Sequence, residues 1–173
     1  MLIVRVHGIK DGKSVLDLEC DTSEIENISE EFFGKVNVHA VFTKVGKRYT
    51  LIGNAQCQAK LICDISLEEY DELINAEISY TFIANTESYM LRKDIGDYET
   101  DNGEIIVHED DQFIDISDLI RQDLLLNLPI KRVSPNYRDK SFEDLHPELS
   151  SKNIKDDVVA ERWLDLKKIK FSN

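Results

Sequence analysis

The sequence predicts an α+β fold, in which a twisted and mainly antiparallel sheet carries helices. Residues 36–63 contain two segments in which apolar and polar side chains alternate, the period of half-buried strands. Residues 115–127 and the C-terminal residues from 156 or 157 onward instead carry apolar side chains at helical spacing. The pattern leaves open whether the sheet curls towards a barrel.

Length and composition predict one domain. A chain of 173 residues with 42% hydrophobic and 32% charged residues can bury a stable core without disulfides. We expect residues 1–130 to form a β-rich body with one packed helix, and residues 131–173 to form an extended loop and a C-terminal helix that packs back on the body. Three cysteines at positions 20, 57 and 63 do not predict a disulfide framework. With no secretory pattern and no apolar stretch of about 20 residues, we expect a cytoplasmic protein that does not enter a membrane.

Charge is spread unevenly along the chain. The net charge is -13, and residues 1–130 hold 11 Lys/Arg against 26 Asp/Glu, whereas residues 131–173 hold 10 against 8. Ten acidic residues and no Lys or Arg lie between Asp94 and Ile120. Such a body repels phosphate backbones, so the composition argues against broad nucleic-acid binding and favours a basic protein partner. The acidic stretch alone is equally explained as a solvated loop.

The N-terminal third predicts two strands and a helix. Residues 1–7 and 14–20 read as short strands around an Asp11-Gly12 turn. Residues 22–33 follow as a short helix, with Ser23 as its cap and Glu26 three positions later.

The middle of the chain predicts a long hairpin and one further strand. Residues 36–44 and 48–63 are joined by residues 45–47, and Gly53 suggests a bulge or a bend. Residues 66–73 read as an acidic turn or helix, and residues 77–84 as a strand. Residues 85–112 read as a polar loop that encloses a short strand at 105–107.

The helix predicted at 115–127 contains two misplaced residues. Asp115 is its cap, and it ends before Leu128-Pro129 because the residue preceding a proline avoids the α region. Asp123 falls within the apolar stripe, where we expect buried backbone N–H groups or an arginine to meet it; the alternative is a partner site. Leu125 falls on the polar face, so the leucines at 124–126 form a cuff that either residues 131–173 or a partner covers. The apolar stripe itself comprises Ile116, Leu119, Ile120 and Leu124.

No catalytic, cofactor or metal site is predicted. The segment GIKDGKS (8–14) is one residue too short between its glycines for a phosphate loop. Cys57 and Cys63 would lie about 20 Å apart on a strand, too far to share a zinc ion. Histidines stand singly at positions 7, 39, 108 and 146, without the pairing of metal ligands.

Two segments together resemble the YceD family of bacterial proteins. They are GNAQCQAKLICDISLEEY (53–70) and FIDISDLIRQDLLLNLPI (113–130), and AERWLDLKKI (160–169) is similar to the family's closing helix. The resemblance covers roughly residues 36–170. Ser66 stands where relatives have the second cysteine of a C-x-x-C pair, and no cysteine follows the Leu-Pro segment, so the chain lacks the thiolates for a structural zinc. The residues that fit the family pattern are Gly53, Cys63, Leu67, Asp115, Asp123, Leu126, Leu128 and Pro129.

The resemblance implies a role in producing or accumulating large-subunit ribosomal RNA, with no established catalysis. We therefore expect a non-enzymatic factor in large-subunit biogenesis that binds a basic ribosomal protein, precursor RNA, or both. The alternatives are a nuclease that processes ribosomal RNA and a structural homodimeric adaptor that uses the leucine cuff; the sequence does not set the oligomeric state. Cations around an aromatic ring can neutralise and stack on single-stranded RNA. The candidate contacts of this kind are Lys131, Arg132, Tyr137, Arg138 and Lys140.

Overall fold

A computed structural model describes residues 1–93, 98, 100 and 102–140. The chain divides into two compact units, Met1–Val133 and Ser134–Asn173. The helix predicted from residue 156 or 157 onward lies outside the described residues. No helix in the described part of the chain is long and apolar enough to span a bilayer.

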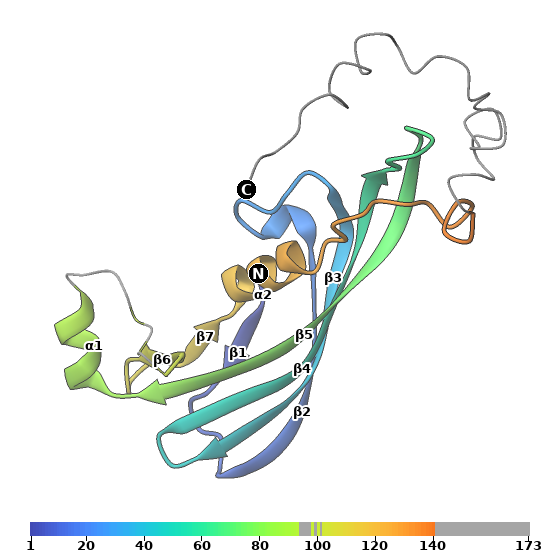
Figure 1. Cartoon of the computed structure of the whole chain (residues 1–173). Helices are drawn as coiled ribbons and strands as arrows, with labels where there is room; N and C mark the ends of the chain where they lie inside the picture. Colours follow the sequence, from blue (N-terminus) through green and yellow to red (C-terminus); the bar gives the residue numbers. More distant parts are fainter. Residues whose placement is uncertain (94–97, 99, 101, 141–173) are drawn as a thin grey trace, which may run out of the picture. The chain divides into compact units, whose positions relative to one another are not determined.

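The first unit is an α+β structure built on a five-stranded sheet, as predicted (Figure 1). The strand order is β2-β3-β4-β5-β6; neighbours from β2 to β5 are antiparallel, and β6 runs parallel to β5. Because β2 and β6 are the outer strands, the sheet is open and does not close into a barrel. The strands are β2 (Gly12–Asp21), β3 (Phe32–Val45), β4 (Arg48–Ile62), β5 (Glu69–Ala84) and β6 (Glu104–Val107).

Alternation along the strands places one face of this sheet in the core. On β3, Val36, Val38, Ala40 and Phe42 are buried, while the residues between them are exposed or half-buried. The predicted hairpin of residues 36–63 is confirmed as β3 and β4. Their pairing extends to Val45 and Arg48, next to the turn. The predicted strands at 77–84 and 105–107 are the second half of β5 and most of β6.

A helix packs on the buried face of the sheet. Helix α2 (Ser117–Leu126) contacts β4 and β5, and its side chains at Ile120 and Leu124 are fully buried in the core (Figure 1). It ends before Leu128-Pro129, as predicted. A two-stranded sheet of β1 (Ile3–Arg5) and β7 (Phe113–Asp115) leads into the helix, and the backbone N–H of Ile116 donates to the carbonyl of Leu2 at 2.9 Å.

The N-terminal prediction is wrong in two places. Strand β1 pairs with β7, more than a hundred residues away, and Asp11-Gly12 leads into β2 and does not turn a hairpin. Residues 22–33 form no α-helix; they contain the 3-10 turn η1 (Thr22–Glu24), without a side-chain cap, and the first two residues of β3. Strand β3 instead begins at Phe32. Just before it, the carbonyl of Glu31 already accepts the backbone N–H of Lys60 on β4, at 2.7 Å. Pairing with β4 therefore overrides the weak helical pattern.

Gly53 is not a bulge. Pairing of β3 with β4 is continuous from Asn37 to Val45, and the register shift lies instead between Phe33 and Asn37, where Gly34 has a φ of +77°. Gly53 is a close-approach position, because a Cβ there would lie 2.1 Å from the carbonyl oxygen of His39 and 2.5 Å from the Cα of Ala40. The space is filled by the neighbouring backbone.

Two further segments differ in part from the prediction. Of the turn or helix predicted at 66–73, only the start lies in a turn and none of it is helical, since β5 begins at Glu69 and pairs with β4 from there onward. The polar loop at 85–112 contains a helix that the pattern missed, α1 (Thr86–Lys93). The side-chain oxygen of Asn85 accepts the N–H of Ser88 at 3.0 Å, which is the bond expected of a capping asparagine.

Candidate functional site

Asp123 on α2 reaches across to the sheet and meets a tyrosine. The hydroxyl of Tyr80 on β5 donates to the Asp123 carboxylate, and both side chains are half-buried. The prediction that Asp123 meets buried backbone N–H groups or an arginine is wrong. The partner of this carboxylate in the apolar stripe is the Tyr80 phenol. Burial, and then the hydrogen bond and charge of Asp123, raise the pKa of Tyr80 above its ordinary value, so the hydroxyl stays protonated and donates.

The leucine run that follows Asp123 has three different environments. Leu124 is fully buried, Leu125 is half-buried against the core, and Leu126 is 82% exposed. Within the described part of the chain, the cuff is therefore not covered all round; residues 141–173, most of the predicted cover, lie outside that part.

The prediction of Asp115 as the helix cap is wrong, because α2 begins at Ser117 and its N-cap position is Ile116, without a side-chain cap bond. Asp115 lies one position earlier, where its carboxylate accepts the N–H of Ser117 at 2.9 Å.

We predict that Asp123→Ala lowers the free energy of unfolding by about 1–3 kcal/mol, because it leaves the half-buried Tyr80 hydroxyl without its acceptor. Chemical denaturation of Asp123→Ala, Tyr80→Phe and the double variant measures the coupling. The double variant should cost less than the sum of the single ones. Gln122→Ala, on the exposed side of α2, should change stability by less than about 0.5 kcal/mol. Strictly additive costs would contradict the pairing.

The two segments of the family pattern meet at the end of the β4–β5 hairpin. Cys63 and the residues after it form the turn, in which the N–H of Leu67 donates to the carbonyl of Cys63 at 2.9 Å. The N–H of Asp64 donates to the carbonyl of Arg132 at 2.7 Å, and the N–H of Arg132 donates to the Asp64 carboxylate at 2.8 Å. This reciprocal pair fixes the chain just after Pro129 against the hairpin.

The guanidinium of Arg132 belongs to the same junction. It donates to both carboxylate oxygens of Glu31, at 2.5 and 3.2 Å, in the two-point geometry that favours arginine over lysine. Both side chains are about one-third exposed. Arg132, a predicted RNA contact, thus stabilises the junction between three distant segments in this structure.

The other predicted cations are distributed over both units. Lys131 is exposed in the first unit. In the second, Tyr137 and Lys140 form a tight turn, with the ammonium of Lys140 4.8 Å from the centre of the Tyr137 ring and the N–H of Lys140 donating to the Tyr137 carbonyl at 3.2 Å. Arg138 is exposed beside them. The structure thus brings together a cation and an aromatic ring at 137–140.

The outer face of the five-stranded sheet carries polar rows that the sequence analysis did not single out, beside an exposed apolar row of Val15, Val41 and Ile52. Its rows run across the strands, and one row consists of Asp17, His39, Asn54 and Glu77, paired in that order. His39 Nδ1 lies 2.5 Å from the Asp17 carboxylate. The alternation of polar and apolar residues along each strand indicates an exposed polar side. Which polar residues form a row across the strands can be deduced only from the strand order and register. Shallow hollows at this row are lined by residues such as Asn37, Asn54 and Gln56.

The cysteines lie in the protein interior. All three are free and buried, and burial raises the pKa of the Cys57 thiol to about 11, although it contacts the backbone carbonyls of Gln58 and Phe33. No group of three His, Cys, Asp or Glu side chains in the described residues could hold a metal ion.

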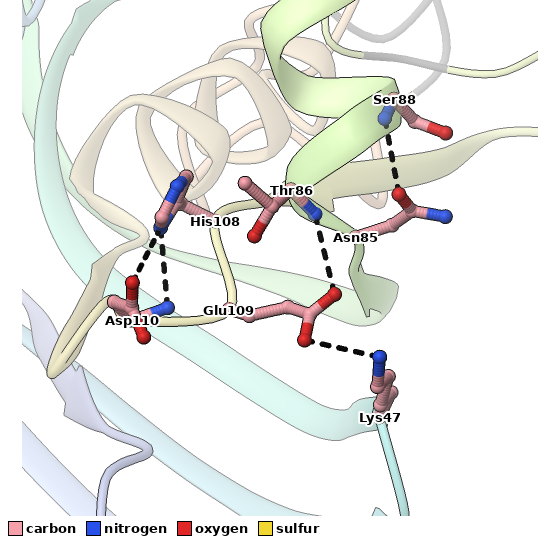
Figure 2. A network of polar contacts seen from close by, with 7 residues as sticks. All are labelled: Lys47, Asn85, Thr86, Ser88, His108, Glu109 and Asp110. Atoms are coloured by element: carbon pink, nitrogen blue, oxygen red, sulfur yellow. Dashed lines mark hydrogen bonds and ion pairs between the residues drawn. The ribbon is translucent and has the colours of Figure 1, made fainter.

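A second polar cluster joins the β3–β4 turn to the start of α1 (Figure 2). The Glu109 carboxylate lies 3.0 Å from the ammonium of Lys47 and accepts the N–H of Thr86 at 3.4 Å. These contacts lower the pKa of Glu109. Nearby, the N–H of Asp110 donates to His108 Nδ1 at 3.2 Å. Glu109 therefore connects the hairpin turn, through Lys47, to the start of the helix, through Thr86.

Fold and surface define an acidic α+β protein in which a leucine-rich helix is docked on an open, mainly antiparallel sheet. The family described as large ribosomal RNA subunit accumulation protein YceD matches residues 51–170, and the chain belongs to this family. No curated protein and no solved structure matches the chain. The match includes both segments that carried the resemblance. The family's description associates the chain with accumulation of large-subunit ribosomal RNA, and hence with ribosome biogenesis.

Proposed function

We propose that the protein acts without catalysis in large-subunit biogenesis, by binding a basic ribosomal protein on the outer face of its five-stranded sheet. The observation that carries this proposal is the charge of that face. Exposed carboxylates stand on the outer face of β2 at every second position, and on the outer face of β5 at intervals of two and six residues. They are Asp17, Glu19 and Asp21 on β2, and Glu69, Asp71 and Glu77 on β5.

The cations on this face are fewer and mostly paired. Lys35 lies 2.5 Å from Glu19, Lys60 lies 3.8 Å from Glu69, and Arg48 is bonded to Glu104. Exposed pairs of this kind contribute little to stability, about 0–1 kcal/mol each. They reduce but do not cancel the excess of carboxylates, and a body with a net charge of -15 over residues 1–130 attracts cationic partners at long range.

Affinity capture of the tagged full-length protein from cell extract tests the proposal. Basic ribosomal proteins should be recovered, and they should remain after treatment with nuclease. Loss of every ribosomal protein on nuclease treatment would overturn the proposal, because RNA would then carry the association. Cleavage of precursor RNA by the purified protein with Mg²⁺ would support a nuclease instead, and recovery of a homodimer alone would support the adaptor.

Direct RNA contact is the second component, and we assign it to Lys131, Tyr137, Arg138 and Lys140, with Arg132 retained as a structural residue of the junction. Replacing Lys131, Arg138 and Lys140 together by alanine should reduce the slope of log K against log salt by about 2 for single-stranded RNA. Electrophoretic mobility shifts over a salt series measure this slope. A matched triple variant of exposed lysines elsewhere, Lys10, Lys13 and Lys93, should leave the slope unchanged. Equal effects of the two variants would contradict the assignment.

A further inference from the structure

We infer that the open edge of β2 accepts an extended, basic segment of a partner protein as an additional strand. The inference rests on the proposed function and specifies how its partner binds. Strand β2 is ten residues long and is the outermost strand next to β3 (Figure 1). Along an edge strand, every second residue points its N–H and C=O away from the sheet. Ten residues present about 33 Å of such backbone.

Two leucines on the inner side of β2 lack the cover that the next strand has. Leu16 and Leu18 are half-buried, whereas their partners across the ladder on β3, Ala40 and Val38, are almost completely buried. An additional strand beside β2 would remove the remaining apolar surface of both leucines from water. Backbone pairing and apolar burial would then act together, as in known cases of strand addition.

Charge on the outer side of β2 selects the kind of strand. Asp17, Glu19 and Asp21 stand at every second position, about 7 Å apart, which matches the spacing of alternate residues on an added strand. Lysine or arginine at those positions would lie directly across from the carboxylates. A second copy of β2 would bring further carboxylates to the same edge, and RNA would bring phosphates, so both are disfavoured.

The remaining open edge of the sheet is a poorer acceptor. Strand β6 pairs only with Thr81–Ala84, which leaves the earlier part of β5 without a neighbouring strand among the described residues. There, however, the inner side chains of Ile74, Ala76 and Ile78 are already buried. An added strand would gain little apolar contact on β5, and this difference favours β2.

A fluorescent ten-residue peptide in which lysine and valine alternate is a direct probe. Fluorescence anisotropy gives its affinity for the full-length protein, and amide exchange by NMR gives its position. We expect alternate β2 amides between Lys13 and Glu19 to exchange at least tenfold more slowly with the peptide bound. The variant Asp17→Asn, Glu19→Gln, Asp21→Asn should bind at least tenfold more weakly. The matched variant Glu69→Gln, Asp71→Asn, Glu77→Gln, with the same change in net charge, should lose less than threefold.

Three results would overturn the inference. The first is equal affinity for a peptide with the same side chains and fully N-methylated amides, which cannot pair as a strand. The second is protection of the alternate β2 amides already in the free protein, because the edge would then be occupied by residues 141–173 or by a second copy. The third is an equal loss of affinity in the two charge variants.

The inference and the proposed function fail in distinguishable ways. If the β2 variant captures basic ribosomal proteins from extract as well as the unaltered protein does, the proposed function stands and the β2 edge is overturned as its site. If the unaltered protein captures none, the proposed function falls, and the peptide measurements still decide whether the edge accepts a strand.

Discussion

Replacing Gly53 with alanine is expected to lower the free energy of unfolding by about 3 kcal/mol or more, the upper range for overpacking. The new Cβ would lie 2.1 Å from the His39 carbonyl oxygen and 2.7 Å from the Cβ of Ala40. Gly53 sits in the middle of the sheet, paired with Ala40 on β3 and Ile78 on β5, so neither neighbour can move without disturbing the core. Denaturant titration should show a lower midpoint with an unchanged slope.

Gly46→Ala provides the matched control. Gly46 lies in the β3–β4 turn with a φ of +59°, and no atom comes within 4 Å of a Cβ built there. Its replacement should cost about 1–2 kcal/mol, from backbone conformation alone. If Gly53→Ala were no more destabilising than Gly46→Ala, the two strands could not be as close as the structure places them. The presence of Gly53 in the family pattern would then need another reason.

Local periodicity predicts much of this fold because the strands of the five-stranded sheet and α2 each bury only one side. Odd and even positions on β3 differ clearly in polarity, so both its span and its buried face follow from the sequence. Strand β1 is different. With three residues it carries too short a pattern to identify its partner, and its pairing with β7 depends on contacts over more than a hundred positions.

Side-chain partners across the fold are the part that the sequence analysis could not supply. A half-buried acid on an apolar stripe predicts that Asp123 has a partner, but only the packing of α2 on β5 identifies that partner as Tyr80. Similarly, the sequence shows that residues 131–140 are basic. It does not show that Arg132 binds Glu31, 101 positions away, which makes this arginine a structural residue and not a free RNA contact. The position of β2 at the edge of the sheet could not be predicted either, because the alternation of polar and apolar residues does not indicate the strand order.

The leucine run of α2 gives the second large prediction. Leu124→Ala should lower the free energy of unfolding by about 3–5 kcal/mol, because it removes a fully buried side chain and leaves a cavity between helix and sheet. Leu126→Ala, two residues on and 82% exposed, should cost less than about 0.5 kcal/mol. Thermal and chemical denaturation of both variants measures the difference at constant helix propensity.

The pair also tests what the exposed end of the helix does. Since the two substitutions are chemically identical, their contrast reports only burial in the folded protein. A large cost for Leu126→Ala would mean that this leucine is covered in solution, and its dependence on protein concentration would separate a second copy from the protein's own chain. A small cost for Leu124→Ala would contradict the docking of α2 on the sheet, and with it the Asp123–Tyr80 contact that this docking creates.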